Sequence, residues 1–210
     1  MSTIHETIDY LEKRVYEFAH LGVVDLENGA RLVGHIPHVA EFGYLNCLGY
    51  PLEAEKILEL EKQFLISFDA DLREFFMKYN GLSLYDGAFA FYGKRGAFSR
   101  TSGWLNFEPF EISMPNTVER IRDALPSHFF IALFQRNVAF NSRIYYDTKS
   151  KKYFECATKN SIEPLHSWDS LSEMLRYYID LLHPHFDNQG KKISTWRIPD
   201  SKPSKGKSRK

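Results

Sequence analysis

Two dipeptides that favour tight turns, Asn28-Gly29 and Asp86-Gly87, each separate a pair of short strand-like runs. Both positions of such a dipeptide tolerate the positive φ that a two-residue hairpin turn requires. Strands joined by so few residues pair antiparallel, because a parallel pair needs a crossover connection of about a dozen residues or more. The flanking runs are residues 23–27 and 30–33 for the first dipeptide, and residues 82–85 and 88–92 for the second.

Three further strand-like runs follow later in the chain, with only polar turns between them. They cover residues 128–134, 143–147 and 152–157. Amphipathic helices flank these strands at both ends of the chain. The arrangement predicts an α+β fold, in which a mainly antiparallel sheet is packed by N-terminal and C-terminal helices.

The helix boundaries are marked by capping residues and prolines. Thr3 and Glu6 have the spacing of a capping box at the start of the first helix, and Gly22 ends it. Pro51 is expected to open a second helix. A short helix is expected to begin at Asn116 and end before Pro126, and the last helix to run from near Ser167, with Trp168 on its buried face, to Pro184. Residues 35–50 have the composition of a loop.

A central helix shows the clearest local pattern. Asp71 and Glu74 have capping-box spacing, and Asn80-Gly81 is expected to stop the helix with Gly81 at positive φ. Four apolar residues at helical spacing predict its buried stripe: Leu72, Phe75, Phe76 and Tyr79.

Composition limits the classes of protein that this chain resembles. It has 210 residues, of which 43% are apolar and 26% charged, which is typical of a globular protein with a core. The longest apolar run, residues 129–134, is far below the roughly 18 residues of a membrane helix. Two cysteines exclude a disulfide framework, and the acidic N-terminus shows no secretory signal. We expect a cytoplasmic protein without membrane contact.

The net charge of zero conceals an uneven distribution. Residues 1–90 carry a net charge of −8, residues 91–190 carry +1, and residues 191–210 carry +7. The last segment is rich in Lys, Ser and Pro, which indicates a disordered tail with at most weak affinity for nucleic acid. We expect three parts: an N-terminal extension (1–48), a main domain (49–190) and the tail (191–210).

Motifs for catalysis or for metal binding are absent from the sequence. His35 with His38, and His183 with His185, lack further ligands nearby, so we interpret them as loop histidines and expect no metal and no cofactor. The loop of residues 93–103 contains glycine and arginine, so it could bind a phosphate group. An enzyme that acts on a nucleotide therefore stays open as an alternative to a binding protein.

The order of these elements resembles the SUKH superfamily, which includes the fungal Smi/Knr cell-wall-assembly regulators and many bacterial proteins. The resemblance covers about residues 50–183. It rests on the segment 49–61, the Leu-Arg-Glu-Phe-Phe helix at 72–76, and the strand pair that ends in residues 91–93. The residues that match the family signature are Leu72, Phe75, Phe76, Tyr79, Asn80, Gly81, Gly87, Tyr92 and Gly93. Phe68-Asp69 replaces the pair Leu-Pro that usually precedes the family's helix, and Asp69 can cap a helix.

The resemblance implies binding and no catalysis. Bacterial SUKH proteins are regarded as immunity proteins that neutralise a cognate toxin, often a nuclease, whereas fungal members are regulatory scaffolds. We therefore expect an immunity protein whose acidic surface occludes a basic protein toxin, with a regulatory scaffold of the Smi/Knr type as the alternative. The candidate partner-binding residues are Asp69, Asp71, Glu74, Tyr85 and Asp86.

Overall fold

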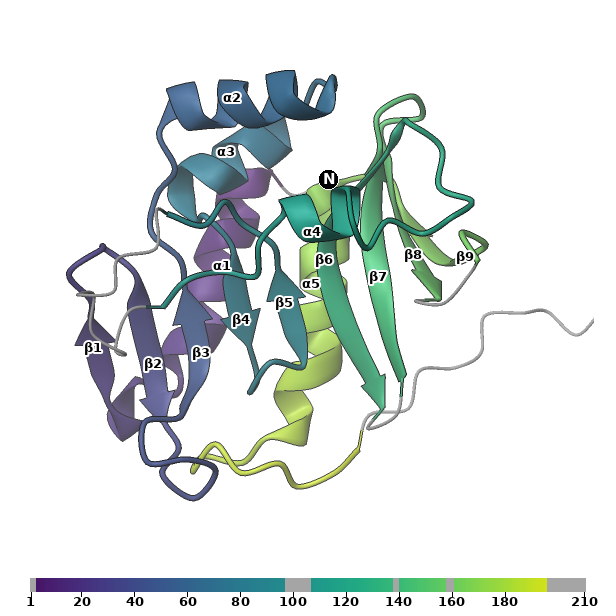
Figure 1. Cartoon of the computed structure of the whole chain (residues 1–210). Helices are drawn as coiled ribbons and strands as arrows, with labels where there is room; N and C mark the ends of the chain where they lie inside the picture. The colour runs from purple at the N-terminus through teal and green to yellow at the C-terminus, as the bar shows by residue number, and fades with distance from the viewer. Residues whose placement is uncertain (1–2, 97–106, 138–139, 158–160, 196–210) are drawn as a thin grey trace, which may run out of the picture.

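The computed structural model describes residues 3–96, 107–137, 140–157 and 161–195. Within these residues, nine strands form one sheet in which each strand pairs antiparallel with the next strand along the chain (Figure 1). The predicted α+β class is confirmed. The strands are β1 (Val23–Asp25), β2 (Arg31–His35), β3 (Tyr44–Leu48), β4 (Leu82–Leu84), β5 (Phe89–Phe91), β6 (His128–Asn137), β7 (Phe140–Asp147), β8 (Lys152–Ala157) and β9 (Pro164–Trp168).

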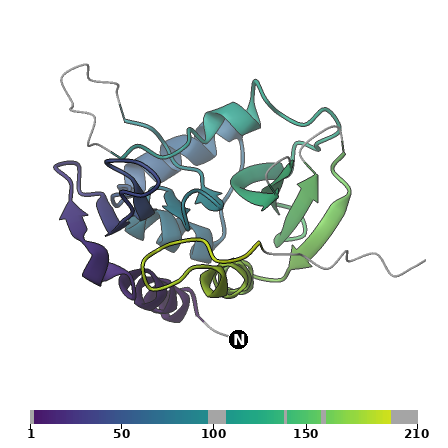
Figure 2. The same ribbon diagram turned by 90° about the horizontal axis from the view of Figure 1, so that it is seen from below.

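Helices α1 (Ile4–Tyr16) and α5 (Leu171–Leu182) lie side by side on one face of the sheet (Figures 1 and 2). Arg176 of α5 joins them, because its guanidinium donates to the Thr7 hydroxyl and to the Glu6 carbonyl, each at 3.2 Å. The predicted capping box of Thr3 and Glu6 is confirmed at the start of α1. None of the described helices is long and apolar enough to cross a membrane.

Helices α2 (Ala54–Phe64) and α3 (Ala70–Lys78) lie together beyond one end of the central strands (Figure 1). Phe75 and Phe76 of α3 are fully buried, and their ring centroids lie 4.5 Å and 5.8 Å from that of Phe91 in β5. The N-cap of α3 is Asp69, whose carboxylate accepts from the Leu72 N–H at 2.8 Å. The predicted capping pair at residues 71 and 74 is therefore wrong, since both residues already lie within the helix.

The turns agree with the predicted hairpins but differ in detail. Gly81 has the predicted positive φ of 76°. Positive φ extends over Tyr85, Asp86 and Gly87 in the β4–β5 turn, whereas in the β1–β2 turn Gly29 has a positive φ and Asn28 does not. The Asn28 carboxamide oxygen instead accepts from the Ala30 N–H at 3.1 Å.

Two strands were not predicted. Strand β3 lies within residues 35–50, which were expected to form a loop, and β9 contains Trp168, which was expected on the last helix. Helix α5 begins at Leu171 after an N-cap at Ser170, and α2 begins at Ala54, three residues after Pro51. The two helices begin later than expected because the residues before them, Glu53 and Ser170, take an extended conformation.

The short helix α4 (Ser113–Asn116) ends at the residue that was expected to begin it. Asn116 is buried, and its carboxamide exchanges two hydrogen bonds of 2.8 Å with the backbone N–H and C=O of Phe130. Its side chain therefore holds the 107–127 segment against β6 and does not cap a helix.

A buried carboxylate links β8 to three other strands, β6, β7 and β9. Glu155 of β8 is fully buried, and it accepts a hydrogen bond from the Ser142 hydroxyl and lies 3.0 Å from both Arg136 Nε and His166 Nδ1. Burial alone would raise the pKa of Glu155, but the hydrogen bonds from His166 and Ser142 and the charge of Arg136 together lower it. Glu155 therefore stays ionised inside the core.

The sheet is continuous across the predicted boundary between residues 48 and 49, because β3 pairs with β4. At the other end of the main domain, residues 191–195 return toward the fold. Lys192 forms a β-bridge with Phe186, and the Ile193 N–H donates to the His185 carbonyl at 2.9 Å. The rest of the predicted tail, residues 196–210, lies outside the described residues.

Candidate functional site

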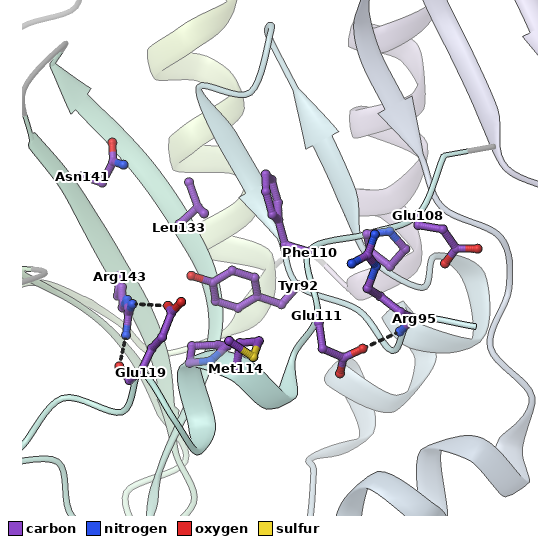
Figure 3. A pocket seen from close by; sticks show the side chains of 12 residues that line it. Tyr92, Arg95, Glu108, Phe110, Glu111, Met114, Glu119, Leu133, Asn141 and Arg143 are labelled. Carbon is purple, nitrogen blue, oxygen red and sulfur yellow. Dashed lines mark hydrogen bonds and ion pairs between the residues drawn. The ribbon is translucent and has the colours of Figure 1, made fainter. Parts of the chain in front are cut away.

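A cavity of about 540 Å³ opens on the sheet face opposite α1 and α5 (Figure 3). We call it the front cavity. Tyr92, which follows β5, and Leu133 of β6 contribute to its sheet side, and residues 108–119 form the opposite side. Leu133 faces the cavity. The adjacent Phe134 points the other way and packs on Tyr178 of α5, with the two ring centroids 4.8 Å apart. The sheet thus separates the front cavity from the helical core.

Apolar side chains are exposed on the outer side of the front cavity. Phe110 is 56% exposed and Met114 41% exposed, and both line the opening. Val118, two residues beyond α4 and next to the lining residue Glu119, is 81% exposed. Neighbouring exposed apolar side chains around a hollow are typical of surfaces that bind another molecule.

Five charged side chains also line the front cavity. Arg143 pairs with Glu119, with Nη2 and Oε2 at 2.9 Å. The carboxylate of Glu111 accepts from the backbone N–H groups of Arg95 and Ser113 at 3.0 Å each.

Glu108 likewise accepts from the Gly96 N–H at 3.2 Å. Glu108 and Glu111 therefore hold the base of the 93–96 loop through neutral donors, which fix the position of a carboxylate without cancelling its charge.

Tyr92 is the most deeply placed polar residue of the front cavity, with 5% of its surface exposed. Its hydroxyl points into the cavity toward the Glu119–Arg143 pair (Figure 3). Burial is the main cause that raises the pKa of Tyr92 to about 12, so the side chain is a neutral phenol at physiological pH.

Asn80 fixes the chain beside this cavity. The Asn80 side chain donates to the Lys94 carbonyl and accepts from the Lys94 N–H, both at 2.7 Å. A Cβ atom on Gly93 would lie 2.6 Å from Asn80 Oδ1, and one on Gly49 would lie 2.3 Å from the Asn80 carbonyl oxygen. Glycine is therefore required where these two segments cross Asn80.

The predicted partner-binding carboxylates fall in two places. Asp69, Asp71 and Glu74 lie at the start of α3, whereas Asp86 lies in the β4–β5 turn at the opposite end of the sheet (Figure 1). Asp69 also accepts from the Tyr153 hydroxyl at 2.9 Å. The structure brings three of the four carboxylates together and leaves Asp86 apart.

Tyr85 is 1% exposed, and its ring stacks on Phe186 at a centroid distance of 5.5 Å. Its hydroxyl lies 3.2 Å from His183 Nδ1. The side chain therefore fills the core beneath the β4–β5 turn and presents no exposed ring to a partner.

Helix α2 carries acidic side chains near the front cavity. Glu59 lies 2.6 Å from Lys94 Nζ, next to the cavity residue Arg95. Glu55 in the first turn of α2 and Glu53, its N-cap, are also exposed. Glu61 of α2, by contrast, is buried and pairs with Arg73 at 2.8 Å.

The described histidines and cysteines form no site of their own. No group of three or more potential metal ligands occurs in the described residues. Burial raises the pKa of Cys47 and of Cys156 to about 12, so both are unreactive thiols at neutral pH. Of the loop considered for phosphate binding, only residues 93–96 are described, and their backbone N–H groups at 95 and 96 donate to carboxylates.

Comparison with known proteins leaves the family open. No protein-family model matches the chain, and no curated protein matches it either.

Proposed function

We propose that this chain is an immunity protein of the SUKH type, which neutralises a cognate basic toxin by covering its active site. The front cavity and its exposed apolar rim dock on the toxin. The carboxylates of α2 and of the start of α3 steer the encounter. The mechanism is steric, so the chain needs no catalytic group of its own.

One observation carries the proposal: two exposed apolar side chains line one hollow, and a third is exposed on the same short segment. Phe110, Met114 and Val118 lie on a nine-residue stretch that borders the front cavity. Burial of such side chains at the centre of an interface supplies most of the affinity of many protein complexes. Charged pairs at the periphery, such as Glu119 with Arg143, set the orientation of the partner.

Charge supports a basic partner. Residues 1–90 carry a net charge of −8, and Glu53 and Glu55 are exposed at the start of α2. An acidic surface raises the association rate of a basic protein, and nuclease toxins are commonly basic because they bind phosphates.

The test is rescue of cell growth from a basic toxin encoded beside this gene. Co-expression of the chain should restore growth, and Phe110→Asp together with Val118→Asp should abolish rescue. Val39→Asp is the matched control, since Val39 is 54% exposed in the β2–β3 loop, away from the front cavity. Equal rescue by the double variant would reject this surface. Binding of an endogenous regulator in place of any toxin would favour the scaffold alternative.

A further inference from the structure

Helix α2 presents four exposed residues at helical spacing, Glu55, Leu58, Lys62 and Leu65, which we call the α2 stripe. Leu58 is 60% exposed and Leu65 91% exposed. At 3.6 residues per turn, the four positions fall within an arc of about 80° on the helix surface. Because α2 lies outside α3 at one end of the molecule (Figure 1), the α2 stripe is open to a partner.

Leu65 contributes little to the fold from its position. It follows the last turn of α2 in the left-handed conformation, with φ at 53° and ψ at 43°. Glycine or asparagine is usual there, because the Cβ atom of any other residue comes close to a carbonyl oxygen. A leucine that is 91% exposed recovers none of this cost through burial in its own chain. A partner that covers the side chain would recover it.

The two charges of the α2 stripe are unpaired within the described part of the chain. Neither Glu55 nor Lys62 makes a side-chain hydrogen bond or an ion pair there, whereas Glu59 pairs with Lys56 at 2.9 Å and with Lys94 at 2.6 Å. Two helical turns separate Glu55 from Lys62, with Leu58 between them. The α2 stripe therefore has an acidic end, an apolar centre and a basic end.

Such a sequence of charges is complementary to itself when two copies of the helix run in opposite directions. We infer that the α2 stripe binds the α2 stripe of a second copy of this chain, about a two-fold axis near Leu58. In a two-fold interface the same surface meets itself, so Glu55 of each copy faces the partner's Lys62. The two Leu58 side chains meet at the axis, and each Leu65 lies against the start of the opposite α2. The pairing needs no toxin, so it goes beyond the proposed function.

The size of this contact predicts a weak dimer. A helix of 11 residues is about 16 Å long, so the pair buries less than the roughly 1,200–2,000 Å² of a stable interface. Burial of the leucines supplies affinity, and the charge pairs fix the antiparallel direction. We expect a monomer at about 1 µM and a substantial dimer fraction at about 0.5 mM.

Sedimentation velocity of the full chain over this concentration range measures the dimer. Glu55→Lys and Lys62→Glu each place like charges opposite one another, so each should weaken the homodimer at least about tenfold. A mixture of the two variants should form a heterodimer, because every facing pair is then again one acidic and one basic residue. The double variant should form a homodimer like the wild type. Recovery in both cases would also show that the variants are folded.

A cysteine at the two-fold axis gives an independent measurement. Leu58→Cys should form a disulfide-linked dimer with oxidised glutathione, and burial keeps the thiols of Cys47 and Cys156 unreactive. Leu125→Cys is the matched control, since Leu125 is 53% exposed outside the α2 stripe, and it should cross-link far less.

Three results would each overturn the inference. The first is a wild-type chain that stays monomeric at the highest concentration. The second is a dimer that neither charge reversal weakens, or that the mixed variants fail to restore. The third is equal cross-linking of Leu58→Cys and Leu125→Cys.

Discussion

Asn80 and Lys94 are joined by two reciprocal hydrogen bonds of 2.7 Å, from the side chain of one to the backbone of the other. The Asn80 N–H also donates to the Tyr50 carbonyl at 2.7 Å. Asn80 therefore connects the entry to α2, the end of α3 and the exit from β5. This crossing holds Tyr92 and the base of the 93–96 loop in position for the front cavity.

Asn80→Ala should lower the free energy of unfolding by about 1–3 kcal/mol, because the N–H and C=O of Lys94 both lose their partner. Urea denaturation measures the change. Asn80→Asp keeps the acceptor and loses the donor, so it should have an intermediate effect. An alanine variant as stable as the wild type would show that water replaces both bonds.

Phe76→Ala should cost about 3–5 kcal/mol, the usual range for a buried phenylalanine. Phe76 is fully buried, and its ring centroid lies 5.6 Å from that of Phe68 and 5.8 Å from that of Phe91. The next residue is the matched control, since Met77 is 46% exposed and Met77→Ala should change stability by less than about 1 kcal/mol. Similar losses for both variants in thermal unfolding would contradict the observed packing of α3.

Asp71→Asn should stabilise the protein at pH 7 by less than about 1 kcal/mol. Burial, followed by the charges of Asp69 and Glu74, raises the pKa of Asp71. The native state therefore binds this proton more tightly than the unfolded state, and ionisation of Asp71 destabilises the fold as the pH rises. The gain from the amide should disappear below about pH 4, where the aspartate is protonated in both states. A gain that is equal at pH 3 and pH 7 would have another cause.

Glu155→Gln should cost about 3 kcal/mol at pH 7, because the Arg136 charge would lose its buried counterion. The pKa of Glu155 is lowered in the fold, so its contribution to stability is fully present above the usual glutamate pKa near 4.3 and is lost as the pH falls from there through the lowered pKa of the folded state. The difference between variant and wild type should therefore shrink in acid. Arg136→Met in the same chain should recover part of the loss, as a double-mutant cycle would measure. No recovery would mean that His166 and Ser142 account for the effect.

Two truncations test where the domain ends. Removal of residues 196–210 should leave the melting temperature nearly unchanged, as their Lys-, Ser- and Pro-rich composition predicts. Removal of residues 191–210 should lower it, because the bridge from Lys192 to Phe186 and the bond from Ile193 to His185 are lost. A loss of several degrees in the shorter truncation would show that Trp196 packs on the fold.

Local patterns predicted most of the helices and the positions of seven of the nine described strands, since these elements have regular apolar spacing or flank a turn dipeptide. The stripe of Leu72, Phe75 and Phe76 is an example, and all three residues are buried. Strand β3 was not predicted, because Asn46 interrupts its apolar pattern. The Asn46 carboxamide oxygen accepts from the Tyr85 N–H at 3.1 Å, 39 residues away, so its burial depends on a partner that spacing cannot indicate.

The front cavity could not be predicted from local spacing either, because it is formed by residues far apart in the sequence. Its lining comes from three separate parts of the chain, near residues 92–95, 108–119 and 133–143. Tyr92 was singled out only as a signature residue, while Phe110 and Met114 lie in a segment without clear periodicity. Glu61 shows the same limit, because its burial depends on a pair with Arg73, 12 residues later, that the spacing of α2 does not indicate.

The strictly sequential sheet has a consequence for synthesis on the ribosome. Each strand pairs with its predecessor, so the sheet can grow as the chain emerges, through contacts that are short in sequence. Helix α1 is made first but packs on α5, and Thr7 lies 169 residues before its partner Arg176. The apolar stripe of α1 therefore has no neighbouring α5 until nearly the whole domain has been translated, and the nascent chain passes through a stage at which a chaperone can bind that stripe.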